Sequence, residues 1–170
     1  MLDLLPCPDP RSGHRIRGGE DGFTLVELVI VVTIIGILAA LAAPSVASLI
    51  AGQRSSGAAT DIYIALATAR SEATKRNVDV TLSQKTGGWQ NGWEILDPAD
   101  GSKQLLDHGA LVTGAVSGSL ASVVYQGSGR VSGSTKPTFA VTSSLGGSTA
   151  TKYVCVDLSG RPLVQATSCP

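Results

Sequence analysis

Residues 22–52 have the sequence GFTLVELVIVVTIIGILAALAAPSVASLIAG, and this stretch decides the fold of the chain. Its only charged residue is Glu27, and residues 28–52 carry no charge at all. In a helix that rises about 1.5 Å per residue, the uncharged part reaches about 38 Å, which exceeds the roughly 30 Å hydrocarbon core of a bilayer. The stretch therefore predicts a membrane-spanning helix over residues 23–53.

The order of signals around this helix indicates how the chain is processed. An ordinary secretory signal places its cut site after the apolar region. Here the small residue that fits a cut site, Gly22, comes before the apolar region, so cleavage keeps the membrane helix on the mature protein. This order is typical of a membrane-anchored subunit.

Residues 22–27, GFTLVE, resemble the class III signal of type IV pilins and their relatives. The resemblance implies that a prepilin peptidase cuts between Gly22 and Phe23, which removes residues 1–22 as a leader, and that the new amine of Phe23 is then N-methylated. Pro44, inside the helix, also fits the pilin pattern and is expected to kink or loosen it. The alternative is a plain single-pass anchor.

Glu27 has a physical argument of its own. An ionisable group at the centre of a membrane helix costs about 2.5–3.5 kcal/mol, so such groups usually have a partner. Glu27 lies about one turn from the start of the helix, close to a membrane interface. The family resemblance implies that it pairs with the amino terminus of a neighbouring subunit during assembly. The alternative is a solvated glutamate that the helix dipole favours.

The distribution of arginines predicts the orientation of the helix. Arg11, Arg15 and Arg17 precede the apolar stretch, whereas only Arg54 follows it closely. Basic residues favour the cytoplasmic side, so the amino-terminal end is expected inside and the C-terminal domain in the periplasm. The pilin resemblance implies that the surrounding lipid is that of the inner membrane.

The helix is expected to continue beyond the membrane to about residue 76. Residues 54–76 are rich in alanine, and their apolar residues recur at steps of three and four, which is typical of a helix with one buried face. These residues are Ala59, Ile62, Leu66, Ala69 and Ala73. The second half of the helix is therefore expected to pack against a domain.

The composition changes at Asn77, after which valine, threonine, glycine and serine dominate. Alternating patterns predict strands at 78–83, 92–96, 104–107, 111–113, 122–126, 138–142, 152–157 and 162–165. The Gly/Ser/Thr-rich stretches 127–135 and 143–151 are expected to be mobile loops. The prediction is an α+β fold in which the long N-terminal helix packs against a C-terminal antiparallel β domain. The globular domain would comprise residues 54–170, with helix over 54–76 and the β region over 77–170.

Two tryptophans lie close together in the string WQNGW, residues 89–93. This string resembles the W-x-x-G-W segment of H-type pseudopilins of type II secretion and of minor pilins of the FimT/FimU kind. The resemblance extends upstream to residues 77–82 and downstream to the strand at 123–125. Trp89 and Trp93 are expected to anchor the core. The alternative is a ligand-stacking pair.

Cys155 and Cys169 are the two cysteines left after removal of the leader, which contains Cys7. Two cysteines in a domain that faces an oxidising compartment predict a disulfide, with free thiols as the alternative. Together with His108, the single histidine of the mature chain, they make no ligand cluster, so no metal site is expected. No cofactor is expected either.

Catalysis and DNA binding are the two rival classes of function. The sequence has no G-x-S-x-G, no phosphate-binding glycine loop with lysine and no H-E-x-x-H, so no enzyme is expected. FimT-like minor pilins include DNA receptors with a C-terminal G-R-x-R motif, but the corresponding place here, residues 160–163, is GRPL. Arg130, Lys152 and Arg161 remain candidate DNA-binding residues for an alternative role in DNA uptake. The other interpretation is solvated loop charge.

These features indicate a structural minor pilin or pseudopilin of a type II secretion pseudopilus or a type IV pilus. The resemblance implies as partners a prepilin peptidase, other pilin subunits and an inner-membrane assembly platform, with an assembly ATPase at a distance. DNA stays a possible partner in the alternative role.

Overall fold

The computed structural model describes residues 22–112 and 114–170. The predicted leader, with Cys7 and the arginines Arg11, Arg15 and Arg17, lies outside these residues. The described chain falls into two compact units, one that ends at Ala40 and one from Leu41 to Pro170.

A single helix, α1 (Leu25–Arg76), runs through 52 residues. It begins after Thr24, whose Oγ1 accepts a hydrogen bond from the backbone N–H of Glu27 at 3.2 Å. A threonine that accepts from the third residue of the helix satisfies one of the N–H groups that have no partner within the helix. The helix continues through Pro44 without ending there.

In the second unit, α1 buries one face. The buried residues between Ala51 and Ala73 follow steps of three and four, and they include all five of the apolar stripe predicted from the sequence. They are Ala51, Ser55, Ala58, Ala59, Ile62, Ala65, Leu66, Ala69 and Ala73. The predicted packing face is therefore confirmed, and its many alanines allow the strands to approach the helix closely.

The helix ends in a hydrogen-bonded turn. Asn77 has a positive φ of 54°, and the N–H of Val78 donates to the carbonyl of Ala73 at 3.3 Å. This pattern is the Schellman motif, in which a left-handed residue closes the last turn. Asparagine tolerates this conformation better than most non-glycine residues. The turn sends the chain directly into the first strand.

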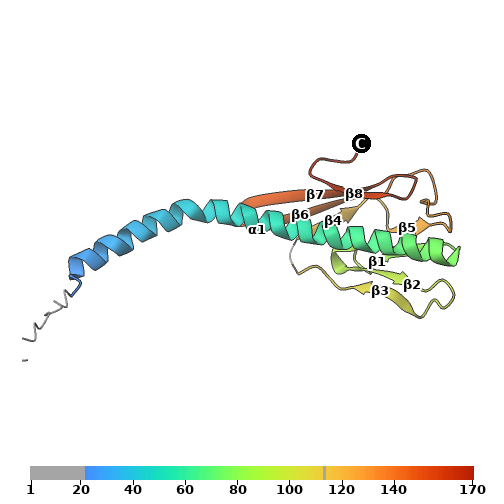
Figure 1. The fold of residues 1–170 in the computed structure, drawn as a ribbon, viewed down its shortest axis with the longest axis horizontal. Coiled ribbons are helices and arrows are strands. Elements are labelled where there is room, and N and C mark those ends of the chain that lie inside the picture. Colours follow the sequence, from blue (N-terminus) through green and yellow to red (C-terminus); the bar gives the residue numbers. More distant parts are fainter. Residues whose placement is uncertain (1–21, 113) are drawn as a thin grey trace, which may run out of the picture. The chain divides into compact units, whose positions relative to one another are not determined.

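Two four-stranded antiparallel sheets make up the β region (Figure 1). The first has the order β3-β2-β1-β5, formed by β1 (Val80–Gln84), β2 (Trp93–Leu96), β3 (Gln104–His108) and β5 (Ser122–Tyr125). The second has the order β4-β6-β7-β8, formed by β4 (Ala115–Gly118), β6 (Thr138–Leu145), β7 (Ser148–Val156) and β8 (Pro162–Gln165). The predicted α+β class is confirmed, and the β domain contains two sheets.

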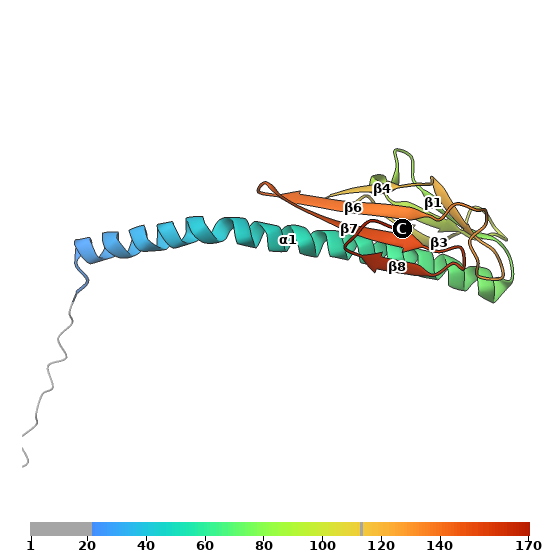
Figure 2. The same ribbon diagram turned by 90° about the horizontal axis from the view of Figure 1, so that it is seen from above.

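The core lies between the second part of α1 and the two sheets (Figure 2). Each sheet contributes inward-facing residues, such as Leu82 and Ile95 from the first and Phe139 and Val154 from the second. In β6 the buried residues alternate with less buried ones. This alternation is the pattern of an antiparallel sheet with one face on the core.

Both tryptophans are core residues. Trp89 lies in the short 3₁₀ helix η1 (Trp89–Asn91), where its Nε1 donates to the carbonyl of Leu120 at 2.8 Å. Its ring meets that of Phe139 in β6 edge to face, with the ring centres 4.8 Å apart. Trp93 is also fully buried. The core-anchor interpretation therefore fits this structure.

Two expectations about the β region are wrong. The stretch 111–112 is not a strand, and Thr113 lies outside the described residues; the strand is β4, which begins at Ala115. The stretch 143–151 is not a loop, because β6 and β7 extend through it and turn at Gly146-Gly147. Both glycines have positive φ angles, 56° and 82°, as a two-residue hairpin turn requires. Hydroxyl pairs such as Thr142–Thr151, with Oγ1 atoms 3.1 Å apart, line the extended ladder.

Candidate assembly segment and domain surface

The segment around the expected processing site is open. Gly22 precedes the helix, a Cβ atom added there would meet no atom of the described residues within 4 Å apart from its chain neighbours, and Phe23 is 80% exposed. Glu27 lies in the first turn of α1 and is also exposed. This geometry leaves the bond between Gly22 and Phe23 accessible and the carboxylate of Glu27 available to another molecule.

The apolar residues that follow have no protein cover in the described chain. From Leu25 to Ile50, every large apolar side chain of α1 is exposed. By length and composition, α1 could cross a membrane. Burying this much apolar surface is strongly favourable, at about 25 cal/mol per Å². The segment therefore needs lipid or other subunits around it.

His108, the last residue of β3, packs against the buried Trp93. Its ring stacks on Trp93, with the ring centres 4.0 Å apart and an angle of 9° between the planes. Its Nε2 lies 3.6 Å from Oδ2 of Asp61 on α1, close enough for an ion pair when the imidazole is protonated. His108 thus covers the buried indole and connects the first sheet to the helix.

Cys155 and Cys169 form a disulfide, as the cysteine count predicted. Their Cα atoms are 5.6 Å apart, within the usual range for such a bond. Cys155 lies on β7 and Cys169 is the second-last residue of the chain. The bond therefore ties the C-terminal tail, after β8, back to the second sheet.

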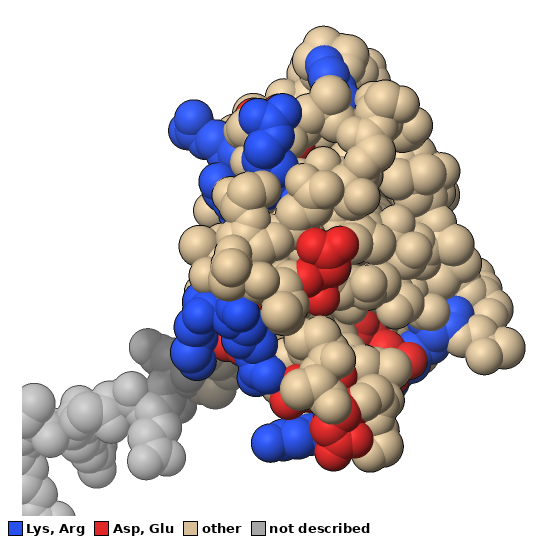
Figure 3. Space-filling view, turned by 90° about the vertical axis from the view of Figure 1, so that its right-hand side faces the viewer, with Lys and Arg blue, Asp and Glu red and all other residues tan. Residues whose placement is uncertain are grey.

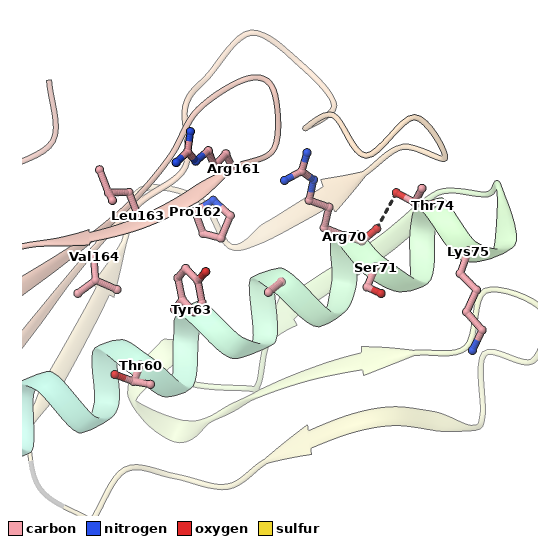
Figure 4. A pocket seen from close by; sticks show the side chains of 11 residues that line it. Thr60, Tyr63, Arg70, Ser71, Thr74, Lys75, Arg161, Pro162, Leu163 and Val164 are labelled. Carbon is pink, nitrogen blue, oxygen red and sulfur yellow. Dashed lines mark hydrogen bonds between the residues drawn. The ribbon is translucent and has the colours of Figure 1, made fainter.

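A surface depression of the domain lies between α1 and β8, and we call it the α1–β8 groove. It has a volume of about 980 Å³. Its lining residues come from one side of the helix and from the start of the strand: Thr60, Tyr63, Ala67, Arg70, Ser71, Thr74, Lys75, Arg161, Pro162, Leu163 and Val164. Figure 4 shows Tyr63 of α1 facing Pro162 of β8, with Arg70 and Arg161 at one rim.

Hydrogen bonds hold the side chain of Arg70 and the backbone of Arg161 in place. Nε of Arg70 donates to the carbonyl of Gly129 at 3.1 Å. The carboxylate of Asp157 accepts the backbone N–H of Arg161 at 2.9 Å and the hydroxyl of Ser159. The Ser159 bond first, and the Arg161 N–H next, lower the pKa of Asp157 below its ordinary value. Asp157 is therefore an anion that holds the turn before β8 in place.

The loop that contains Gly129 and the turn that precedes Arg161 meet at Gly160. A Cβ atom on Gly160 would collide with the carbonyl oxygen of Gly129, and the φ of Gly160 is 82°. Only glycine meets both requirements without strain. The same carbonyl of Gly129 accepts the bond from Arg70, so helix and both loops converge on this one peptide group.

The three candidate DNA-binding residues do not share one site. Arg161 lines the α1–β8 groove, whereas Lys152 lies on β7 beside residues 45–56 of α1, in a different depression. Arg130 lies in the segment between β5 and β6 and is exposed.

On the side of the domain that Figure 3 shows, the basic side chains do not form a continuous surface. There, lysines and arginines form separate groups, with acidic side chains between them. Nothing in this arrangement favours DNA as the ligand. Among the described residues, no cluster of three or more metal-ligating side chains is present either.

The sequence did not predict the α1–β8 groove or the position of Arg70 in its lining. Arg70 and Arg161 are far apart in the sequence and come together only through the packing of β8 beside α1. The one local signal was the glycine before Arg161, which the backbone needs for its positive φ.

Family models match two parts of the chain. The type II transport protein GspH model matches residues 58–160, more than half of the chain. The prokaryotic N-terminal methylation motif matches residues 17–43, which include Gly22, Phe23 and Glu27. A comparison with curated proteins gave no match.

Two crystal structures of the type IV minor pilin FimU of Pseudomonas aeruginosa (strain PAO1) have a similar fold. The crystal form in space group P21 gives a TM-score of 0.58 at 18% identity, over 66% of this chain and 89% of that one. The form in P65 gives 0.55 at 20% identity, over 65% and 91%. At these identities the likeness shows the fold alone.

The methylation motif implies processing by prepilin peptidase, and the family implies assembly with other pilin subunits. Apolar α1 and the family together make the protein a membrane-anchored pilin. The chain therefore belongs to the GspH family of type II transport proteins and is a structural subunit of the minor pilin or pseudopilin kind.

Proposed function

We propose that the first part of α1 anchors this subunit in the inner membrane, with residues 54–170 in the periplasm, until it enters a type II secretion pseudopilus or a type IV pilus. The observation that carries the proposal is the unbroken exposure of large apolar side chains from Leu25 to Ile50. Lipid covers these side chains first, and neighbouring subunits cover them in the filament.

Processing precedes assembly in this proposal. Prepilin peptidase cuts between Gly22 and Phe23, and the amine of Phe23 is methylated. Cleavage places a positive amine four residues before the carboxylate of Glu27, about one helical turn away. In the filament, Glu27 pairs with the amine of a neighbouring subunit, and an inner-membrane platform inserts the subunit.

The experiment that tests this proposal is mass analysis of the membrane form of the protein. We expect a chain that begins at Phe23 and carries a methyl group on its amine. Gly22→Val should block maturation, because a branched side chain replaces the glycine at the cut site. Gly36→Val is the matched control: this glycine also has open space around it, and its substitution should leave processing unchanged.

Two results would contradict the processing step. One is a membrane form that retains residue 1, and the other is a chain that begins beyond residue 40. The orientation has a separate test, which is protease treatment of spheroplasts. A periplasmic domain should be digested there without lysis of the cells, whereas protection until lysis would place the domain in the cytoplasm.

A further inference from the structure

We propose that the α1–β8 groove is the docking surface for an acidic, extended segment of a neighbouring pilin subunit. The inference rests on the proposed function, because it requires that the chain stands among other subunits in a filament. It adds a specific surface and the chemistry of the segment that binds there.

Charge is the first argument. Arg70, Lys75 and Arg161 line the groove, and none of its lining residues is acidic. Lys75 already forms an ion pair, because its Nζ lies 3.6 Å from Oε1 of Glu72. Within the described residues, by contrast, the guanidinium groups of Arg70 and Arg161 have no carboxylate within 4 Å. Two arginines at one rim whose guanidinium groups form no ion pair favour a ligand that carries carboxylates, with which arginine forms paired hydrogen bonds.

Preorganisation is the second argument. The bond from Arg70 Nε to the carbonyl of Gly129 holds that side chain in place and leaves its terminal nitrogens free to donate to a ligand. The turn that carries Arg161 is fixed by Asp157. Groups that are already ordered lose less conformational entropy when a ligand binds, so binding is stronger.

The strand beside the groove is the third argument. β8 is the last strand of its sheet and pairs only with β7, so its other edge has unpaired backbone groups. Such an edge accepts an extended segment as an added strand. Exposed apolar side chains lie at this edge: Leu163 is 55% exposed, Val164 37% and Tyr63, across the groove, 39%.

These features together favour a protein segment over a nucleic acid. Binding to a phosphate backbone grows with the number of cations that contact it, and only two free arginines line this groove. Exposed leucine and valine at a strand edge contribute nothing to phosphate contacts, but they suit the side chains of an added strand. In a filament, contacts between unlike surfaces repeat from subunit to subunit, so a basic groove calls for an acidic surface on the neighbour.

The test is site-specific photo-crosslinking of the full-length protein in cells that assemble the filament. A photoreactive amino acid replaces Val164 in the groove. Val78 is the matched control position, because it is also an exposed valine, 42% exposed, but lies at the end of α1 outside the groove. We expect the Val164 position to cross-link to another pilin subunit, through a peptide that contains Asp or Glu, and the Val78 position not to reach that peptide.

Charge reversal tests the electrostatic part. The double substitution Arg70→Glu and Arg161→Glu should lower the yield of the Val164 cross-link about five- to thirtyfold, the range that corresponds to one or two kcal/mol. Lys103→Glu is the control, since it reverses the charge of an exposed lysine outside the groove. It should leave the cross-link unchanged.

Several outcomes would overturn the proposal. If the subunit is found in filaments but Val164 cross-links to no other subunit, the groove is not a docking surface, while the proposed function stands. A cross-linked peptide without acidic residues would remove the charge argument. A shift of duplex DNA by the full-length protein in detergent, lost in Arg161→Ala, would assign the groove to nucleic acid. A protein that enters no filament would remove the proposed function and this inference together.

Discussion

Arg76, the last residue of α1, and Asp97, in the loop after β2, form an ion pair in which Nη1 lies 2.8 Å from Oδ1. Nε of the same arginine donates to Glu72 at 2.7 Å, one turn earlier in the helix. Asp97 is almost fully buried and also accepts the N–H of Ala99 at 3.0 Å. One side chain thus joins the end of the helix to the first sheet.

Replacement of Asp97 by asparagine should make the domain less stable and less sensitive to acid. The N–H of Ala99 first, and Arg76 after it, hold the pKa of Asp97 below its ordinary value of 3.8, against the effect of burial. A carboxyl whose pKa is lower in the folded state stabilises the fold above 3.8, and this contribution is lost as the pH falls below that value.

The measurement is chemical unfolding of the full chain in detergent between pH 2 and pH 7. Fluorescence is a suitable signal, since both tryptophans are buried in the core. Asp97→Asn should lower the free energy of unfolding at pH 7 and reduce its decline in acid. Asp100→Asn is the control, because Asp100 is exposed and bonds only to nearby backbone and to Ser102. Equal effects of both substitutions would contradict the role of the ion pair.

Loss of the disulfide between Cys155 and Cys169 should destabilise the domain by about 3 kcal/mol, the chain-entropy value for a loop of this size. The substitution Cys155→Ser should lower the unfolding midpoint, while membrane insertion, which depends on α1, stays unchanged. In the wild-type protein without reductant, thiol labelling should find neither cysteine free. Rapid alkylation of either residue in the folded protein would contradict the bond.

The helix was predictable from the sequence because its signal is local. The apolar stretch and the stripe with steps of three and four both follow from the geometry of one helix, so Ile62 and Leu66 could be placed in the core before any packing was known. The motif at Gly22–Glu27 is local in the same way.

The second sheet was harder to predict because its ends are polar. Residues 143–151 are mostly serine, threonine and glycine, a composition that favours loops, although Gly146-Gly147 is also a hairpin signal. Long-range pairing decided the outcome: Thr142 meets Thr151, and the hydroxyl of Ser144 lies 3.0 Å from that of Thr149. The α1–β8 groove has the same origin, because no local pattern brings Arg70 to Arg161.

An alanine at Gly160 should be far more destabilising than an alanine at Gly133. Both glycines have positive φ angles, 82° and 91°, and a side chain there carries a similar backbone cost. Gly133 has open space around it, whereas a Cβ on Gly160 would collide with the carbonyl of Gly129. We expect Gly160→Ala to lower the free energy of unfolding by about 1–3 kcal/mol more than Gly133→Ala, as overpacking does. Equal losses would show that the two loops can separate at no cost.

Glu27 offers a test that separates assembly from helix stability. Glu27→Ala should leave the protein in the membrane, because it removes a charge from an apolar helix, but should reduce its entry into filaments. The matched control is Thr24→Ala, which removes the hydroxyl that caps the helix and keeps the carboxylate. Its expected cost is about 1 kcal/mol of helix stability, with little effect on assembly. Sheared filaments and membranes, probed with an antibody to the domain, give both quantities. Filament entry of Glu27→Ala at the wild-type level would refute the pairing role of Glu27, and equal loss in both variants would assign its effect to the helix start.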